Sequence, residues 1–466
     1  MGLSLLTFSS CKAPSYVRDE KIDTIPQSYL NQSTDTTTIG AMGWKSFFKD
    51  PLLLALIDSA LVNNQELNIQ LMELQIGNNE VMARKGEYLP SLGARIGGGA
   101  DKVARYTTHG AMEESVEMEP GKAIPKVVGD LHLGVYASWE VDIWKKLRNA
   151  KYAAQQRYLA SVEGRNFMTT QIVAEIANSY YDLLAFDKQL EILDQNIEIQ
   201  SNALKIVRME KLAARVTELA VLKFEAEVYY TKSLRFEIQQ KITEVENRIN
   251  LLVGRFPQAV ARNAATFESA VPEDINSGIP AQLIDLRTDV KQAELNLKAA
   301  KLDVKVAKAS FYPTLSLDGG LGLNAFNPKY IIRPQSILYN IAGNMVAPLL
   351  NRNALKANYY NTNAKQMQSI FNYERTILNA VVEVTNQISN IDNLKKTYDF
   401  KNQQVSSLTG AIKVSNDLFA SARADYMEIL LTQRDVVEAK FDLVETKNKQ
   451  FQARINIYKA LGGGWK

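Results

Sequence analysis

One stretch of the sequence decides the fold: Leu131-His132-Leu133-Gly134-Val135-Tyr136-Ala137-Ser138-Trp139-Glu140-Val141-Asp142. Apolar residues occupy every second position, with polar or small residues between them. Because side chains of a β-strand alternate between its two faces, this pattern predicts a strand with one apolar and one polar face. Three further segments alternate in the same sense: 92–100, 315–324 and 337–345. We therefore expect four strands arranged as two hairpins.

Two long spans without helix breakers follow these hairpins. No proline occurs between Pro125 and Pro257, and none follows Pro348. Apolar residues in both spans recur at helical spacing among Glu, Lys, Gln and Asn, which predicts long amphipathic helices. A turn is expected near residues 213–218, where Thr217 is suited to capping the next helix, and another near 420–425. Each span is thus predicted to be a helical hairpin, at 145–254 and 353–461.

The two spans are copies of one module. An offset of 208 aligns Glu175 with Glu383, Arg215 with Arg423, and Gly254 with Gly462 (383 − 175 = 208). This period is far longer than the roughly 20–50 residues of solenoid repeats, so it indicates duplication of a whole unit of helices and strands.

The duplication predicts the domain organisation. Each copy is expected to contain a helix, a strand hairpin and a helical hairpin, with strand hairpins at 88–143 and 312–350. The expected segments are a leader at 1–11, an extended segment at 12–50, the first repeat at 51–256, a linker at 257–279 and the second repeat at 280–466.

Composition excludes some classes of function. Lys and Arg number 54 against 51 Asp and Glu, a net charge of +3 with no long basic run, so nucleic-acid binding has no electrostatic basis. No apolar stretch approaches the ~18 residues of a spanning helix, but strands of a membrane barrel are shorter and only half apolar.

Four strands are too few to close a membrane barrel, whose smallest examples need about eight, so the chain is expected to pair with copies of itself. Aromatic residues at the strand ends fit interfacial girdles, although aromatics also favour strands of a soluble sandwich. These residues are Tyr88, Trp144, Phe311, Tyr312, Phe326 and Tyr330.

Few residues offer reactive chemistry. Cys11 is the only cysteine and ends a short apolar run, a context that resembles the lipobox of bacterial lipoproteins, so we expect it to be lipidated after removal of residues 1–10. The alternative is an ordinary free thiol near the terminus. His109 and His132 have no cysteine or carboxylate cluster at ligand spacing, so no catalytic site, metal site or cofactor is expected.

Taken in order, several motifs resemble the TolC-type outer-membrane efflux channels, in the lipoprotein branch that serves resistance-nodulation-division pumps. They are Asp50-Pro51-Leu52, Ser138-Trp139-Glu140-Val141-Asp142-Ile143-Trp144, Leu286-Arg287-Thr288-Asp289-Val290, Phe311-Tyr312-Pro313 and Tyr458-Lys459-Ala460-Leu461-Gly462-Gly463-Gly464-Trp465. Thr288 departs from the proline usual in the family. The resemblance implies an α+β fold in which a homotrimer builds a membrane β-barrel from four strands per chain, continued by a coiled-coil α-barrel across the periplasm.

The resemblance also implies a function and partners. A family member is a passive conduit rather than an enzyme; it sits in outer-membrane lipid, and a periplasmic adaptor docks it to an inner-membrane pump. Arg215, Val216 and Thr217 match the adaptor-docking tip, whereas Arg423, Asp425 and Tyr426 lie where members place a periplasmic gate. Both turns could instead be solvated, with Asp425 acting only as a helix cap. An outlet for type I protein secretion and a soluble periplasmic scaffold or adaptor remain alternative functions.

Overall fold

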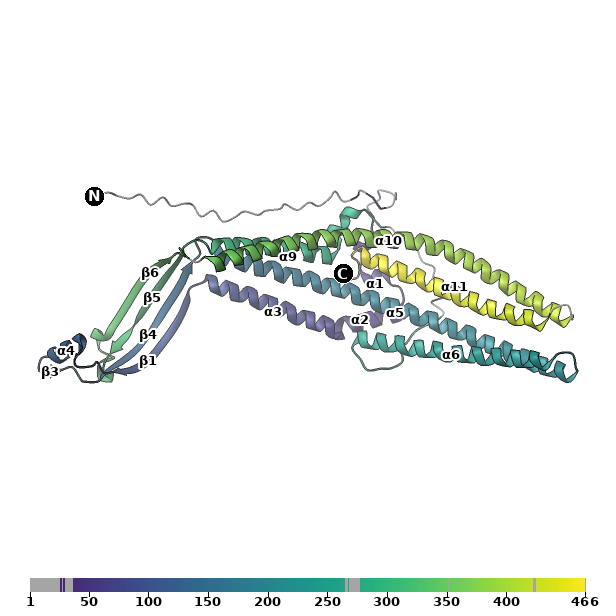
Figure 1. Cartoon of the computed structure of the whole chain (residues 1–466), viewed down its shortest axis with the longest axis horizontal. Helices are drawn as coiled ribbons and strands as arrows, with labels where there is room; N and C mark the ends of the chain where they lie inside the picture. The colour runs from purple at the N-terminus through teal and green to yellow at the C-terminus, as the bar shows by residue number, and fades with distance from the viewer. Residues whose placement is uncertain are drawn as a thin grey trace. The chain divides into compact units, whose positions relative to one another are not determined.

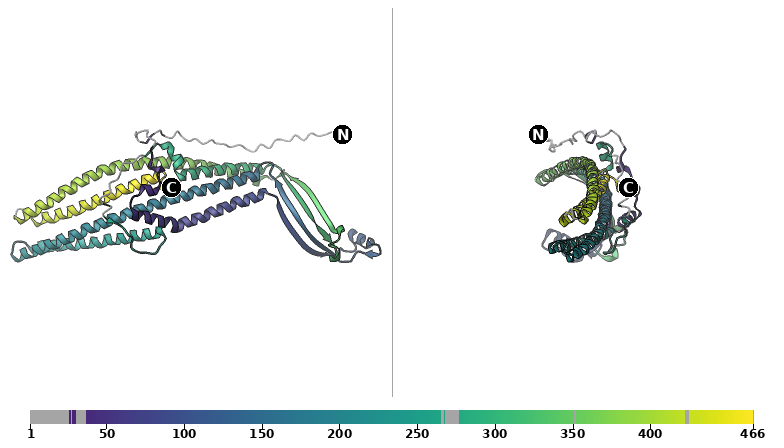
Figure 2. Two further views of the ribbon diagram at one scale, coloured as in Figure 1. Left: turned by 180° about the vertical axis from the view of Figure 1, so that it is seen from behind. Right: turned by 90° about the vertical axis from the view of Figure 1, so that its right-hand side faces the viewer.

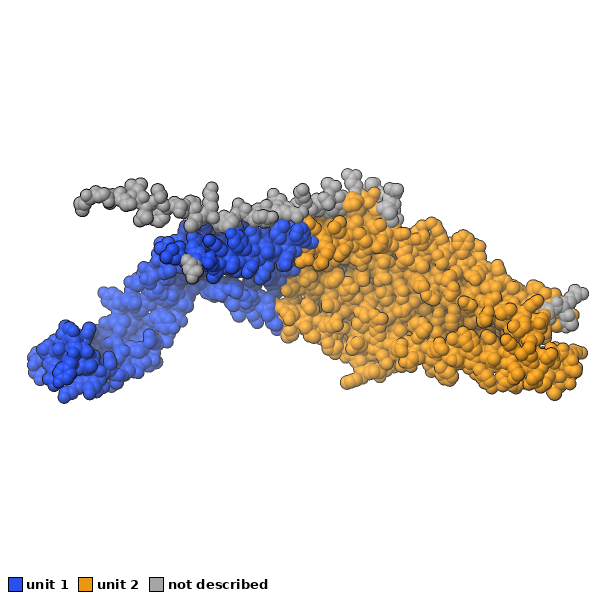
Figure 3. Space-filling model, viewed as in Figure 1, with its two compact units in different colours: residues 1–20, 75–159, 295–371 blue, residues 21–74, 160–294, 372–466 orange. Residues whose placement is uncertain are grey.

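The structure is a computed structural model that describes residues 26, 28–29, 37–264, 267, 277–350, 352–421 and 425–465. Cys11 and Arg423 therefore lie outside the described residues. The chain forms two compact units, coloured separately in Figure 3. Unit 1 holds the described parts of 75–159 and 295–371, and unit 2 holds those of 21–74, 160–294 and 372–466.

Unit 1 is built on a four-stranded antiparallel sheet (Figure 1). Its strands are β1 (Ser91–Asp101), β4 (Val128–Val141), β5 (Thr314–Ala325) and β6 (Ile337–Val346), in the order β1-β4-β5-β6. The four predicted strands and both hairpins are confirmed. The run Gly97-Gly98-Gly99 lies inside β1, where it pairs with 130–132 of β4.

The two hairpin loops differ in content. The shorter, between β5 and β6, contains the 3-10 turns η3 (Pro328–Tyr330) and η4 (Pro334–Ser336). The longer loop, between β1 and β4, carries the helix α4 (Thr108–Ser115) and a small hairpin of β2 (Glu117–Glu119) and β3 (Lys122–Ala123). Thr107 begins α4 by accepting a hydrogen bond from the backbone N–H of Gly110. These elements are too short to produce a periodic signal in the sequence.

The two breaker-free spans are helical hairpins, as predicted. The first consists of α5 (Lys146–Leu212) and α6 (Glu218–Val253), and the second of α10 (Asn353–Ala420) and α11 (Tyr426–Ala460). Both views in Figure 2 show α6 beside α5 and α11 beside α10. The 67 residues of α5 span ~100 Å at about 1.5 Å per residue. Gly254 and Gly462 end the returning arms at φ of 76° and 89°, left-handed values that favour glycine.

The helix expected before each strand hairpin is divided. In the first repeat, α2 (Pro51–Asn63) and α3 (Gln65–Tyr88) are separated by Asn64. Its side-chain amide donates to the carbonyl of Leu252 at 2.8 Å, and its side-chain oxygen accepts from the N–H of Leu67 at 3.1 Å. Asn64 thus ties the start of α3 to the end of α6, a long-range contact that periodicity cannot reveal. In the second repeat, η2 (Pro280–Gln282) and α8 (Leu283–Leu286) precede α9 (Thr288–Ala309), with Arg287 between.

The core of unit 2 gathers residues from both ends of the chain. The N-terminal segment contributes η1 (Ile39–Ala41) and α1 (Trp44–Phe47). The ring of Phe47 stacks on that of Tyr458 at 3.9 Å, and the Tyr458 hydroxyl donates to the carbonyl of Met42 at 2.6 Å. Asp50 accepts hydrogen bonds from the N–H groups of α2 and from the buried hydroxyl of Tyr180. The segment before α2 is therefore part of the helical core.

A buried ion cluster joins the start of the second repeat to its end. Arg287 bonds to Asp289 at 2.7 Å, to Glu383 at 2.7 Å and to the carbonyl of Ala460 at 2.9 Å. Burial disfavours the charge of Arg287, but the two carboxylates outweigh that cost and raise the pKa of its guanidinium.

No described helix carries an apolar stretch long enough to cross a membrane.

Candidate functional site

The sheet of unit 1 has two chemically different faces. Its register places Leu133 beside Ile96 and Leu323, and Val135 beside Ala94 and Leu321, so one face is apolar across the strands. Ten large side chains on this face are exposed; they are Leu92, Ile96, Leu133, Val135, Leu317, Leu321, Ile337, Tyr339, Ile341 and Met345. Exposed apolar surface of this extent marks a surface that contacts lipid or protein.

The opposite face is polar and hydrogen-bonded across strands. The carboxylate of Asp318 on β5 accepts from Ser138 at 2.7 Å and from Asn344 at 3.3 Å, which lie on β4 and β6. Nearer the loops, the amide of Asn324 donates to Asp130 at 2.8 Å. The register confirms the prediction that the strands present one apolar and one polar face. Among the strands that the structure describes, β1 and β6 each have an edge that pairs with no other strand.

Aromatic residues gather at the end of the sheet where β4 leads into α5. The ring of Trp144 stacks on that of Tyr312 at 4.8 Å, and its indole N–H donates to the carbonyl of Pro313 at 2.8 Å. The indole of Trp139 likewise donates to the carbonyl of Tyr88 at 3.1 Å. Rings that keep an apolar body and bond through a polar edge suit the boundary of a membrane.

Asp142 fixes the turn from β4 into α5. Its buried carboxylate accepts from the N–H of Leu147 at 3.0 Å and, at 3.0 and 3.1 Å, from the backbone and guanidinium N–H groups of Arg148. Burial works to raise the pKa of the carboxyl, but these hydrogen bonds and the charge of Arg148 prevail, so its pKa is lowered. The sequence motif contained Asp142, but its anchoring role was not predicted.

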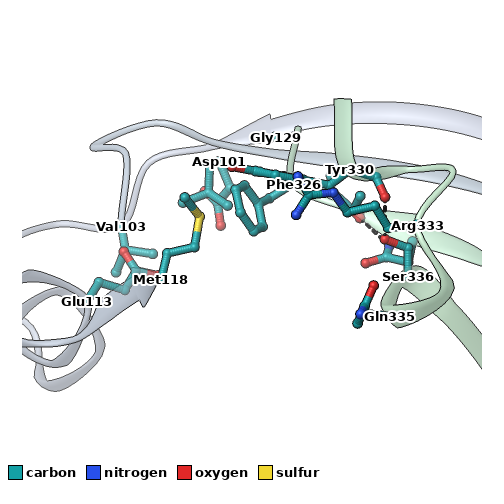
Figure 4. Close-up of a pocket in the computed structure, with 14 residues that line it drawn as sticks. Asp101, Val103, Glu113, Met118, Gly129, Phe326, Tyr330, Arg333, Gln335 and Ser336 are labelled. Atoms are coloured by element: carbon teal, nitrogen blue, oxygen red, sulfur yellow. Dashed lines mark hydrogen bonds between the residues drawn. The ribbon is translucent and has the colours of Figure 1, made fainter. Parts of the chain in front are cut away.

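A cavity of about 810 Å³ opens at the other end of the sheet, among the loops (Figure 4). Asp101 and Phe326 line it from the strand ends, Met118 from the small hairpin, and Tyr330 and Arg333 from the shorter loop. Arg333 lies 4.5 Å from the ring of Tyr330. The predicted aromatics Phe326 and Tyr330 do meet, with ring centroids 5.4 Å apart.

The turn between α5 and α6 presents the predicted docking residues. Arg215 and Thr217 are exposed and Val216 is half-buried. The N–H of Arg215 donates to the carbonyl of Glu210 at 2.9 Å, which closes the end of α5. Thr217 caps α6 by accepting from the N–H of Ala220, as predicted. The side chain of Arg215 is thus free of any role in forming the turn.

The turn between α10 and α11 presents two of the three predicted gate residues, because Arg423 lies outside the described residues. Asp425 is exposed and occupies the N-cap position of α11, but its side chain accepts no hydrogen bond from the first turn of that helix. Tyr426 is half-buried. The alternative interpretation of Asp425 as a helix cap therefore lacks its hydrogen bond.

The structure brings residues of the two turns to one apolar cluster. Val216 and Tyr426 both pack against it, although they come from different repeats. The cluster is formed by Leu204, Val207, Ala220, Val221, Phe224, Val228 and Leu430. The start of α11 therefore contacts the end of α5 and the start of α6 through apolar side chains.

The histidines remain apart from one another, His109 in α4 and His132 in β4. Across the described ranges, no three His, Cys, Asp or Glu side chains are grouped so that they could hold a metal ion.

Comparisons with known proteins agree with this architecture. The family model described as "Outer membrane efflux protein" matches residues 56–255 and 279–463. The pyoverdine export outer membrane protein OpmQ of Pseudomonas aeruginosa is 26% identical over 422 residues, which cover 91% of this chain and 87% of that protein. The cation efflux system protein CusC of Escherichia coli is 25% identical over 426 residues, which cover 91% of this chain and 88% of that protein.

Among solved structures, the open state of the MtrE outer membrane channel of Neisseria gonorrhoeae superposes with a TM-score of 0.85 at 22% identity, covering 97% of this chain and 98% of that one. The fold is thus that of the TolC-like channels. Because the family model covers both repeats and more than half of the chain, this protein belongs to the outer membrane efflux protein family.

Proposed function

We propose that this chain is the outer-membrane channel of a tripartite efflux system, a passive conduit for small toxic molecules that works as a homotrimer. One observation supports association with copies of the chain: the described four-stranded sheet has an exposed apolar face and two unpaired edges, so it needs further strands beside it. The number three comes from the resemblance to the TolC-type channels. Three chains with four strands each reach the size range of membrane barrels, and closure removes every edge.

In this proposal, the repeats at 51–256 and 280–466 each supply one strand hairpin to the barrel and one helical hairpin to a tunnel across the periplasm. Residues 12–50 and the linker at 257–279 belt the tunnel. The cargo is chosen by an inner-membrane pump and passed on through a periplasmic adaptor. OpmQ is named for pyoverdine export and CusC for cation efflux, so membership of the family leaves the cargo class open.

The test is conductance of the purified protein in planar lipid bilayers, combined with its mass in native mass spectrometry. A channel is expected to need detergent after extraction, to have the mass of three chains and to give discrete conductance steps. A protein that stays monomeric and soluble without detergent would be a periplasmic scaffold instead. Loss of peptide or protein export, rather than of drug resistance, in a deletion strain would identify a secretion outlet.

Cys11 is proposed to be the lipidated mature N-terminus, an anchor in addition to the barrel. Intact-mass measurement of membrane-extracted protein is expected to give a chain that begins at Cys11 and carries acyl groups. A Cys11→Ser variant is expected to lose that added mass while it still forms conducting channels. A mature wild-type chain with a free thiol at Cys11 would refute the lipid anchor and leave the channel proposal standing.

A further inference from the structure

A groove of about 470 Å³ lies on the polar face of the sheet, away from the cavity of Figure 4. Its floor consists of glycines on neighbouring strands, because Gly134 pairs with Gly322, and Gly320 is the next residue of the same face on β5. The atoms that lie nearest to the space above Gly134 and Gly322 are backbone atoms of the adjacent strands. The floor is therefore bare, flat peptide backbone.

One wall of the groove combines a cation with two rings. On β1, Arg95 lies between Gly93 and Gly97 on the polar face, and those glycines pair with Tyr136 and His132. A Cβ added to Gly93 would meet the Tyr136 ring at 2.5 Å, and one added to Gly97 would meet the His132 ring. Both rings therefore lean over β1, on either side of Arg95, and leave the glycines of β4 and β5 uncovered.

The charge of this wall is not neutralised. Arg95 is exposed, and no hydrogen bond or ion pair links its side chain to any residue that the structure describes. Arg95 is the only Lys or Arg among the residues that line the groove, and these residues include no Asp or Glu. On the far side, Asn340 of β6 pairs with Gly320 and adds a side-chain amide. A guanidinium offers two parallel N–H donors that match a carboxylate.

We propose that the groove is a binding site for flat aromatic carboxylates. The ring of the ligand lies on the glycine floor, its carboxylate accepts from the guanidinium of Arg95, and the side chains of Tyr136 and Asn340 bound it on two sides. A charged, planar ligand is favoured over a neutral one because an unpartnered cation in a partly enclosed groove gains from an anion. That the groove lines the lumen, and so meets cargo, rests on the proposed function; the binding itself does not.

The test uses 2-naphthoate, a flat fluorescent carboxylate, in equilibrium dialysis against the full-length protein in detergent. Arg95→Gln is expected to weaken binding about tenfold, the loss of a charge-assisted hydrogen bond. Gly320→Val is expected to weaken it as well by filling the floor; an added Cβ there meets the flexible Asn340 side chain at 2.5 Å and the Val135 carbonyl oxygen at 3.7 Å, an ordinary van der Waals contact. Arg105→Gln is the matched control, because Arg105 is exposed in the longer loop and lies outside the groove.

The expected result is saturable binding that both groove variants weaken, that the control retains and that 2-naphthylmethylammonium does not displace. Absence of saturable binding to the wild type, or equal affinity in Arg95→Gln, would overturn the proposal. In planar bilayers, naphthoate is further expected to reduce the conductance of the wild type more than that of Arg95→Gln. A wild type that forms no channel would contradict the proposed function, while dialysis still decides the binding site.

Discussion

At the scale of single residues, Asp142 is expected to control stability. Asn in its place keeps the shape of the side chain, but it loses the negative charge and one of the two oxygens that accept from Leu147 and Arg148. Asp142→Asn should therefore reduce the free energy of unfolding by about 1–3 kcal/mol. The folded-state pKa of Asp142 lies below the usual 3.8. Its contribution is therefore fully present above about pH 3.8 and is lost as the pH falls through the lowered value.

Thermal unfolding of the protein in detergent, measured between neutral pH and the acid limit of its solubility, checks both statements. The variant should start at a lower melting temperature, and the difference from the wild type should shrink in acid. Asp399→Asn, at an exposed position of α10, serves as the matched control and should leave the melting temperature unchanged. A constant difference at every pH would argue against a role for the Asp142 charge.

Local chemistry decided which residue roles could be predicted. Thr217 was recognised because a threonine before a helix carries its own capping group, and the hydrogen bond to Ala220 follows. Asp142 and Arg95 were missed for a different reason. The role of Asp142 depends on the turn after β4, which brings the N–H groups of Leu147 and Arg148 to its carboxylate. Arg95 is notable because the rings of Tyr136 and His132 lean over the glycines on either side of it. Strand alternation does place Arg95 on the polar face, so the face was predictable and the groove was not.

At the scale of elements, the strand faces make a direct prediction. Val135→Arg puts a charge on the apolar face of β4 and should cost roughly 2–4 kcal/mol if that position lies near the bilayer midplane. Tyr136→Arg, one residue along, puts the same charge on the polar face and should leave assembly largely intact. The amount of trimer resistant to detergent and heat, measured in outer-membrane extracts, separates the two. Similar losses for both variants would mean that the faces are assigned wrongly.

Elements were predictable where their signal is periodic and long. The lengths of α5 and α10 agree with each other because the duplication copied an uninterrupted amphipathic pattern, and Gly254 and Gly462 end the returning arms at equivalent positions. The division of the first helix at Asn64 was not predictable, because it depends on a hydrogen bond to Leu252 almost two hundred residues away. The helix α4 was not predicted because its contacts are local and its eight residues are too few to show a helical period, so its sequence resembles that of a polar loop.

At the scale of the whole molecule, two hairpin tips with unlike chemistry imply separate tasks. The exposed side chains of Arg215 and Thr217 are proposed to dock the adaptor. Replacing Arg215 with Glu reverses the local charge and should weaken adaptor binding about tenfold or more, measured by biolayer interferometry with the adaptor encoded beside this chain. Bilayer conductance should be unchanged. Undiminished adaptor binding would place the docking surface elsewhere on the hairpins.

The second tip is proposed to be a gate that three chains close together. The carboxylate of Asp425 is not used to cap α11, so it is available to residues of neighbouring tips, and Tyr426 is already held by the apolar cluster that also contains Leu430. If each chain contributes about 1 kcal/mol of contacts to the closed state, their loss from three chains shifts the ratio of open to closed channels about 100-fold. An adaptor that prefers the open tips then opens the channel without an energy source in this chain.

Replacing Asp425 and Tyr426 together with Ala should therefore raise the open-channel fraction in planar bilayers and admit large antibiotics into cells that lack a working pump. Arg215→Glu is the matched control, since it alters an exposed charge at the other tip and should not change the conductance. Because removal of Tyr426 also disturbs the apolar cluster, Asp425→Asn is needed as a second variant that leaves the packing intact. Its conductance should rise less than that of the double variant but above that of the wild type. If both variants remain as closed as the wild type while the trimer persists, the barrier to leakage lies at other residues of the tunnel.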